Sequence, residues 1–216
     1  MKSREEVHEI VRLLLAEYPE AVCSLDWEKD YELLFSVRLS AQCTDERVNI
    51  VTPALFARFP TLESFAEADT EEVEKYVHSC GFYRAKARDI VSCAKVLVEK
   101  YKGELPQTME ELTALPGVGR KTANLILGDV FRVPGSTVVD THCIRISNRL
   151  GLVKDQKDPV KIEMELRKQL PPETSSDFCH CIVLHGRAVC DARKPKCETC
   201  CLKEYCDYYK ETEQNG

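Results

Sequence analysis

The sequence has no long uncharged apolar run and nothing that resembles a secretion signal. Charged side chains recur through the first twenty residues, and no run of about 18 apolar residues predicts a membrane-spanning helix. Convincing alternation of apolar and polar residues, the sign of a half-buried strand, is also missing. Apolar residues at helical spacing recur instead from end to end, so we expect an all-helical, cytoplasmic protein without a membrane anchor.

Basic residues are in the minority, which weakly disfavours a nucleic-acid partner for the chain as a whole. The formal net charge is −6, but residues 113–154 hold six Arg and Lys against two Asp. That segment therefore carries +4 and the rest of the chain −10. Because phosphate binding needs a basic face rather than a basic total, residues 113–154 are the favoured place for such contact.

Cysteine is abundant, yet the other features of a secreted disulfide scaffold are absent. Such scaffolds are short and carry a secretion signal, whereas this chain has 216 residues and 12 scattered cysteines. Eight of them stand mostly in apolar helical patterns, which predicts buried thiols. The remaining four follow the spacing C-x6-C-x2-C-x5-C, which predicts a metal site formed by Cys190, Cys197, Cys200 and Cys206. Zinc and an iron–sulfur cluster both remain open, with Cys201 as the alternative ligand.

Local signals predict where several helices begin and where one is interrupted. Ser3 and Glu6 have the spacing of a capping box ahead of a helix with one apolar face. Thr70 and Thr108 are expected N-caps of later helices. Pro53 stands inside the helical pattern "RVNIVTPALFARF" and predicts a break or kink there, because proline lacks the N–H that the helix needs.

The string "LPGVGRKTA" allows two interpretations, a phosphate-cradling P-loop or a hairpin between two helices. A P-loop has a glycine immediately before its lysine and a strand ahead of it, but Arg120 occupies that position. The preceding residues "TMEELTAL" have helical character as well. The sequence therefore favours a helical hairpin, with its helices at about residues 109–114 and 120–132.

The hairpin has the properties of an anion site. Gly117 and Gly119 permit a turn that exposes backbone N–H groups, and the next helix presents the positive end of its dipole. Arg120 and Lys121 add positive charge, which suits a DNA phosphate. A plain helix–helix turn with solvated cations is the alternative, which a lone G-x-G would favour and the full string disfavours.

Lys121 and Asp140 are the candidates for chemistry. The helix dipole and neighbouring Arg120 favour the neutral amine of Lys121, the form that makes a Schiff base. Asp140 precedes a helical pattern in "VVDTHCIRI" and is an expected N-cap. An ionised capping carboxylate is also able to stabilise a cation or steer a proton. A solvated surface lysine and a purely structural cap are the alternatives.

Three further segments have residues suited to nucleic acid. Gln42, in "LSAQCTDERVN", lies in a polar break between helices. Phe82, in "GFYRAKA", is beside cations and is either a wedge between bases or a buried ring. The loop "DARKPK", between the first two of the four cysteines, carries cations expected to meet phosphates: Arg193, Lys194 and Lys196.

Together, "LSAQCTDERVN", "LPGVGRKTAN", "VVDTHCIRI" and the four-cysteine series resemble the endonuclease III family over nearly the whole chain. These DNA repair glycosylases have a helix-hairpin-helix and an iron–sulfur cluster. The resemblance implies a six-helix barrel domain and a second domain with a [4Fe–4S] cluster. Pro134-Gly135 in "FRVPGSTVV" favours a domain change near residue 135, and the resemblance implies that the N-terminal helix joins the C-terminal segment. We therefore expect the boundaries 23–135 for the first domain and 1–22 with 136–216 for the second.

The resemblance also implies roles for individual residues. Lys121 matches the nucleophile and Asp140 the essential aspartate of the family. Gln42 matches the residue that fills the gap left by a flipped base, and Phe82 stands in the DNA-inserting loop, where the family often has leucine. His142 matches the rim of the active site.

The implied activity is base-excision repair of duplex DNA by a monomer. An oxidised pyrimidine is extruded, Lys121 attacks C1′ of its sugar, and the resulting Schiff base undergoes β-elimination that nicks the strand. The related adenine glycosylase has a non-lysine residue at this position and a catalytic glutamate in the first loop, whereas here no glutamate near Gln42 precedes Glu46. A non-catalytic DNA-binding or redox-sensing protein is the other alternative, but it would need neither Lys121 nor Asp140.

Overall fold

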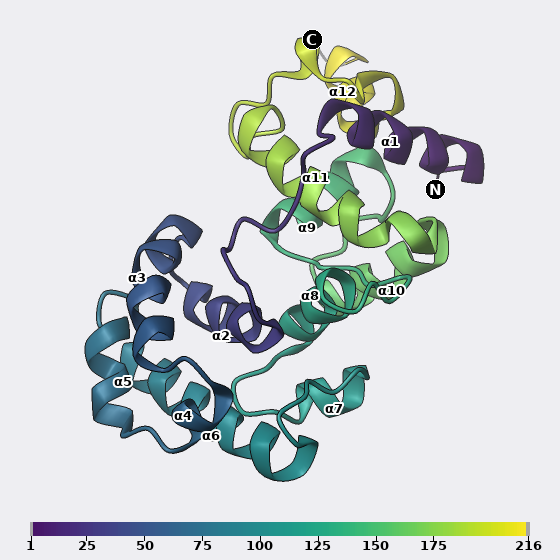
Figure 1. The fold of residues 1–216 in the computed structure, drawn as a ribbon. Coiled ribbons are helices and arrows are strands. Elements are labelled where there is room, and N and C mark those ends of the chain that lie inside the picture. The colour runs from purple at the N-terminus through teal and green to yellow at the C-terminus, as the bar shows by residue number, and fades with distance from the viewer. Residues whose placement is uncertain (1, 215–216) are drawn as a thin grey trace. The chain divides into compact units, whose positions relative to one another are not determined.

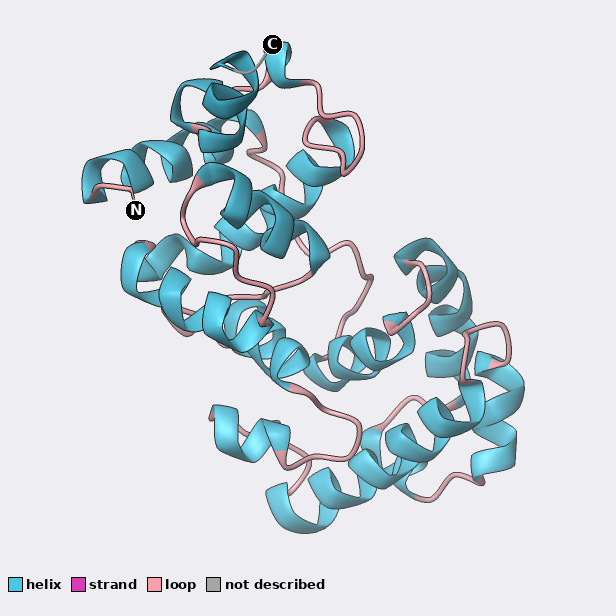
Figure 2. Ribbon diagram, turned by 180° about the vertical axis from the view of Figure 1, so that it is seen from behind, coloured by secondary structure: helices cyan, strands magenta, loops and turns pink. Residues whose placement is uncertain are grey.

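The computed structural model describes residues 2–214 and contains no strand among them (Figure 2), which confirms the all-helical prediction. None of these helices is long and apolar enough to cross a membrane. The helices gather into two compact units, residues 23–131 and residues 2–22 together with 132–214. We call them the hairpin unit and the cysteine unit. The chain leaves the hairpin unit after Phe131, and the sequence analysis placed this change near residue 135.

The hairpin unit surrounds an aromatic core. The ring centroid of Phe65 lies 5.1 Å from those of Phe35 and Phe59, and all three side chains are fully buried. Rings at this separation bury large apolar areas and add favourable edge contacts. The helices of the unit are α2 (Asp30–Ser40), α3 (Asp45–Arg58), α4 (Leu62–Ala66), α5 (Thr70–Val77), α6 (Tyr83–Tyr101), α7 (Met109–Thr113) and α8 (Arg120–Asp129) (Figure 1).

One local prediction in this unit is wrong, and a second is wrong in part. Helix α3 runs without the predicted break through Pro53, and buried Val48, Val51 and Leu55 lie on both sides of this residue. The N-cap of α5 is Asp69 rather than Thr70, and the Asp69 carboxylate accepts a hydrogen bond from the N–H of Glu71 at 3.0 Å. Both residue types cap helices well, so composition alone did not separate the two neighbours.

The cysteine unit joins the first helix to the last third of the chain. Buried Val7, Ile10 and Leu14 form one face of the first helix, which packs against α11 (Figure 1). Its N-terminus has the predicted capping box of Ser3 and Glu6. The helices of this unit are α1 (Arg4–Glu17), α9 (Thr141–Leu150), α10 (Pro159–Gln169), α11 (Ser175–Ala188) and α12 (Asp207–Gln214).

Between α11 and α12 the chain forms no α-helix. Only two short 3-10 turns occur there, Cys197–Thr199 and Lys203–Tyr205. Short-range backbone hydrogen bonds hold this segment, among them Lys196 N–H to the Val189 carbonyl oxygen at 2.9 Å and Cys200 N–H to the Cys197 carbonyl oxygen at 3.1 Å. It carries the four cysteines of the predicted metal site.

Candidate functional site

The predicted hairpin is present, between α7 and α8, and Gly117 shapes its turn. Gly117 has φ of +73°, a left-handed conformation that favours glycine. A Cβ atom at this position would lie 2.8 Å from both Arg38 Nε and Asp89 Cβ. Gly119 differs, because a Cβ there would meet nothing within 4 Å. Of the two glycines, only Gly117 is required by the structure, while the neighbouring Val118 is buried and anchors the turn.

An ion pair lies directly against this turn. Arg38 of α2 reaches Asp89 of α6, with Nη2 2.6 Å and Nε 2.7 Å from the same carboxylate oxygen. Both side chains are about three-quarters buried, so the pair is less screened by water than a surface pair. Sequence analysis missed this pair, because its members are 51 residues apart in the chain.

Lys121 stands in the first turn of α8. The side chain is exposed, whereas Ala123, Ile126 and Leu127 on the opposite face of the helix are buried. The N-cap is Gly119, whose lack of a side chain leaves the helix start without a side-chain cap. First-turn N–H groups have no carbonyl in a preceding turn to bind, so such a start attracts anions. The geometry presents an amine and a helix dipole to solvent at one place.

Asp140 is the N-cap of α9, as its position in the sequence predicts. Its Oδ1 accepts a hydrogen bond from the Cys143 N–H at 2.8 Å. The side chain is half-buried, so the carboxylate is fixed without being withdrawn from solvent. Lys121 belongs to the hairpin unit and Asp140 to the cysteine unit.

His142 lies in the first turn of the same helix and is held by a polar contact. Its Nδ1 is 3.0 Å from Nη2 of Arg145, which also donates to the carbonyl oxygens of Gly186 and Cys190. A Cβ at Gly186 would come within 2.3 Å of His142 Nδ1. Glycine at this position in α11 thus allows α9 to approach. An isolated glycine in a helical pattern was the available sequence signal.

Gln42 and Phe82 lie on two loops that touch. Both have left-handed backbones, with φ of 54° and 57°. A Cβ at Gly81 would lie 3.4 Å from the carbonyl oxygen of Gln42, so the loops are in close contact. The Phe82 side chain is 69% exposed, which excludes the buried-ring interpretation. The structure thus brings these two sequence-predicted residues together.

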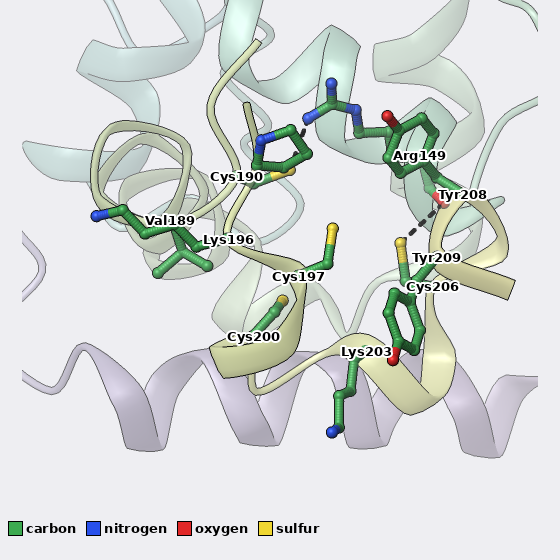
Figure 3. Close-up of a pocket in the computed structure, with 11 residues that line it drawn as sticks. Arg149, Val189, Cys190, Lys196, Cys197, Cys200, Lys203, Cys206, Tyr208 and Tyr209 are labelled. Carbon is green, nitrogen blue, oxygen red and sulfur yellow. Dashed lines mark hydrogen bonds between the residues drawn. The ribbon is translucent and has the colours of Figure 1, made fainter. Parts of the chain in front are cut away.

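The four predicted metal-binding cysteines border one cavity (Figure 3). Cys201 does not line it. In the described part of the chain, no three His, Cys, Asp or Glu side chains converge as a single metal ion requires. The sulfur atoms instead face a wider space, whose lining also includes Arg149, Lys196 and Tyr208. Four thiols around one space fit the donor set of an iron–sulfur cluster.

Polar groups surround the sulfur atoms. Arg149 Nη1 donates to Cys190 Sγ at 3.2 Å, and the Leu202 N–H donates to Cys200 Sγ at 3.4 Å. Burial raises the pKa of the Cys200 thiol to about 12, and burial also raises the pKa of Cys206. Iron must therefore displace protons when it binds these thiols, because only thiolates are good ligands.

Arg149 also positions the basic loop of residues 191–196. Its guanidinium donates to the carbonyl oxygens of Asp191 at 2.7 Å and Ala192 at 3.0 Å. The Asp191 carboxylate accepts hydrogen bonds from the N–H groups of Arg193 and Lys194, which closes a tight turn. The loop is thus ordered by contacts with α9 and with itself.

The three cations of this loop differ in their surroundings. All are exposed, but Lys196 Nζ donates to the Ala188 carbonyl oxygen at 3.0 Å, near the C-terminus of α11. That contact stabilises the helix end, where carbonyl groups lack partners. Arg193 and Lys194 are the residues of the loop most open to an external anion.

The sequence matches two family models. Residues 35–172 match the HhH-GPD superfamily base excision DNA repair protein, and residues 190–206 match the iron–sulfur binding domain of endonuclease III. Endonuclease III of Synechocystis sp. is 48% identical over 203 residues, which are 94% of this chain and 92% of that protein. The chain belongs to the endonuclease III family.

Other relatives and solved structures agree with this family. Endonuclease III of Escherichia coli is 38% identical and matches 93% of this chain and 94% of that protein. A solved non-covalent complex of endonuclease III with DNA has a TM-score of 0.90 at 38% identity, covering 99% of this chain and all of that one. A thermostable thymine-DNA glycosylase has a TM-score of 0.85 at 21% identity, which shows a shared fold alone.

Membership of the endonuclease III family establishes the general activity. The chain is a base-excision-repair DNA glycosylase with AP lyase activity, and it carries a [4Fe–4S] cluster. These predictions from sequence are confirmed. The family models match the segments that contain the hairpin, Asp140 and the four cysteines.

Proposed function

We propose that this endonuclease III relative removes oxidised pyrimidines from duplex DNA and nicks the abasic site through a Schiff base on Lys121. The observation that carries the proposal is the place of Lys121, an exposed amine in the first turn of α8. It directly follows a turn in which Gly117 is sterically required. A DNA phosphate bound at this helix start would bring a sugar within reach of the amine.

The reaction begins with extrusion of the damaged nucleotide, because the reacting atoms are inaccessible inside a duplex. The neutral amine of Lys121 attacks C1′, and the bond from C1′ to the base breaks. The sugar ring opens to leave an imine between Lys121 and C1′. Loss of a proton from C2′ then expels the 3′ phosphate, which is the nick. Water finally hydrolyses the imine and releases Lys121.

Asp140 supplies negative charge in this scheme. Its carboxylate is fixed by the hydrogen bond from Cys143 N–H at 2.8 Å, so it does not have to be ordered during the reaction. A fixed carboxylate stabilises the positive charge that develops on the sugar as the base leaves. The departing base takes up the proton that the attacking amine must lose. His142, in the first turn of α9, would line the rim of the pocket.

The DNA contacts follow from the same surfaces. The hairpin, with Gly117, Gly119 and Arg120, would hold a phosphate, and Arg193 and Lys194 would hold another with help from Lys196. Gln42 would fill the gap left by the extruded base, and exposed Phe82 on the touching loop would wedge the opposite strand. Binding to a single damaged site requires one copy of the chain, so we expect a nucleoid-associated monomer.

The cluster ligands we propose are Cys190, Cys197, Cys200 and Cys206. Their shared cavity and the donors to their sulfur atoms support this set. When bound, the [4Fe–4S] cluster supplies cross-links between four positions of a segment that forms no α-helix. The two ends of the basic loop would then be fixed at Cys190 and Cys197, and Arg149 would only have to orient the loop between them.

The proposed reaction is tested by trapping the imine. Sodium borohydride reduces an imine to a stable amine, so the wild-type protein should form a covalent adduct with duplexes that contain one oxidised pyrimidine. Lys121→Gln should form none while still binding the duplex. Lys154→Gln, a change at another exposed lysine, should trap as well as the wild type.

The alternatives give other outcomes in the same assay. A monofunctional glycosylase would release the base without a trapped adduct or a nick. A non-catalytic binding or redox-sensing protein would retain the base. Adduct formation by Lys121→Gln would show that another amine reacts, and a preference for oxidised purines across a panel of duplexes would overturn the proposed substrate class.

A further inference from the structure

A histidine on α11 contacts the cysteine segment through both its backbone and its ring. The His185 carbonyl oxygen accepts a hydrogen bond from the Cys190 N–H at 2.8 Å. Its ring Nε2 lies 3.4 Å from Cys200 Sγ. One residue thus touches the first and the third cysteine of the series. His185 is 1% exposed, so water does not compete for these contacts.

The other ring nitrogen has a partner from the opposite end of the sequence. His185 Nδ1 lies 3.0 Å from the hydroxyl oxygen of Tyr18, the residue that ends α1. The two rings meet edge to face, with centroids 5.8 Å apart and planes at 75°. The three residues therefore form a continuous polar chain, from the Tyr18 hydroxyl through the imidazole to the Cys200 sulfur.

Only one tautomer of His185 satisfies both contacts when Cys200 is an iron ligand. A ligating cysteine is a thiolate, which accepts hydrogen bonds and has no proton to donate. A neutral imidazole has one N–H and one lone pair. With the proton on Nδ1, the lone pair of Nε2 would face the thiolate and repel it. With the proton on Nε2, the ring donates to Cys200, and Nδ1 accepts from Tyr18.

We propose that His185 is a positioning residue of the iron–sulfur site, which donates a hydrogen bond from Nε2 to the Cys200 thiolate while its Nδ1 accepts one from the Tyr18 hydroxyl. This inference rests on the proposed assignment of Cys200 as a cluster ligand. A second-layer hydrogen bond of this kind orients a ligand and tunes its basicity.

The proposed hydrogen bond has a measurable electronic consequence. A donor to a thiolate spreads the negative charge of the sulfur, which makes addition of an electron to the cluster more favourable. His185 should therefore raise the reduction potential of the cluster. It also ties α1 and α11 to the cysteine segment, so the first helix of the chain contributes to the environment of the cluster.

The experiment measures the cluster itself in the full-length, iron-loaded protein. Protein-film voltammetry should show a lower midpoint potential for His185→Leu than for the wild type. Resonance Raman should show higher Fe–S stretching frequencies, because an iron–thiolate bond strengthens when the sulfur loses a donor. His185→Gln, which retains an N–H donor, should restore most of both shifts. Tyr18→Phe removes one hydroxyl and should give smaller shifts in the same directions.

The tautomer is measured independently in the wild type. Nitrogen-15 NMR of histidine-labelled protein should place the His185 proton on Nε2, and Tyr18→Phe should shift the Nδ1 resonance, because it removes the hydrogen bond to that nitrogen. Tyr205→Phe, a change at another half-buried tyrosine of the cysteine unit, should leave the NMR signals, the potential and the Raman bands unchanged.

Several outcomes would overturn the inference. An unshifted potential in His185→Leu, or a proton on Nδ1 in the wild type, would reject donation to Cys200. An unshifted Nδ1 resonance in Tyr18→Phe would reject the hydrogen bond from Tyr18. If His185→Leu fails to retain iron, the Tyr18→Phe variant and the wild-type NMR spectrum still test whether His185 donates to Cys200. Iron retained by Cys200→Ser would contradict the ligand set instead, so the two failures are distinguishable.

Discussion

The hairpin unit and the cysteine unit are both helical, but different forces hold their functional segments. In the hairpin unit, the turn at Gly117 contacts Arg38 of α2 and Asp89 of α6. The core of this unit includes the buried rings of Phe35 and Phe65. In the cysteine unit, residues 189–206 form only short 3-10 turns around a cavity lined by thiols. Apolar side chains stabilise a fold by leaving water, whereas protonated thiols around a cavity contribute little until they bind a metal.

Removal of iron should therefore destabilise the cysteine segment of the cysteine unit and leave the hairpin unit folded. This is the largest effect we expect. In Cys200→Ser, hydrogen exchange should become fast throughout residues 189–206 while the amides of α6 stay protected. Iron content and the visible absorbance of the cluster should fall together. Cys201→Ser, outside the cavity, should retain both.

The opposite cysteine result would overturn the proposed ligand set. That result is iron lost from Cys201→Ser but kept by Cys200→Ser. Faster hydrogen exchange in α6 as well as in residues 189–206 would show that the hairpin unit also depends on the cluster. The two units would then not be held by different forces.

Asp140→Asn should have the next largest effect, on chemistry rather than on folding. Asparagine caps a helix about as well as aspartate, so the free energy of unfolding should change by less than about 0.5 kcal/mol. Single-turnover base release should slow by roughly 10² to 10⁴, the usual contribution of a positioned acid or base.

The matched control for this change is Asp158→Asn. Asp158 caps α10 by accepting from the Val160 and Lys161 N–H groups. It should alter neither stability nor turnover. Normal turnover in folded Asp140→Asn would reduce Asp140 to a structural cap.

Gly117→Ala should destabilise the hairpin unit by about 1–3 kcal/mol, the usual cost of one strained backbone position. The new Cβ would also collide with Arg38 and Asp89 and disturb their ion pair. Thermal unfolding and affinity for duplex DNA would both report the change. Gly119→Ala is the matched control, since its φ of −96° suits alanine and the space beside it is open. It should cost roughly 0.5 kcal/mol, the loss of a glycine N-cap.

A similar loss of stability in the two glycine variants would contradict the steric argument for Gly117. It would indicate that both glycines serve the turn only through backbone flexibility. The close approach of the hairpin to α2 and α6 would then not be what holds the turn in the hairpin unit.

The smallest effect is expected in the basic loop of the cysteine unit. Lys194→Ala should flatten the slope of log K against log[salt] by about 0.9, the contribution of one phosphate contact. Affinity should fall equally for damaged and undamaged duplex, because phosphate contacts do not read bases. Filter binding over a range of salt concentrations measures both.

Lys196→Ala sharpens this prediction, since Lys196 already binds the Ala188 carbonyl oxygen. It should reduce stability by about 0.5–1.5 kcal/mol through loss of that hydrogen bond, and it should change the salt slope less than Lys194→Ala does. An unaltered slope in Lys194→Ala with full iron content would show that the loop does not touch DNA.

Features that depend on neighbouring residues were predictable from the sequence. The capping box at Ser3 and the caps at Thr108 and Asp140 are all present, because a cap needs only its own side chain and N–H groups two or three residues ahead. The hairpin was predictable for the same reason, as was the gathering of Cys190, Cys197, Cys200 and Cys206, which are close in the chain.

Features that depend on distant residues were decided by the tertiary structure. Helix α3 continues through Pro53 while it packs against α2 and α5, and the need for glycine at 117 comes from Arg38 and Asp89. The contact between Tyr18 and His185 joins positions 167 residues apart. No spacing rule reaches that far, because such pairs meet only after each helix has buried its apolar face. Sequence by itself therefore determined the helical class, several helix caps and the chemistry available, while packing decided which side chains act on one another.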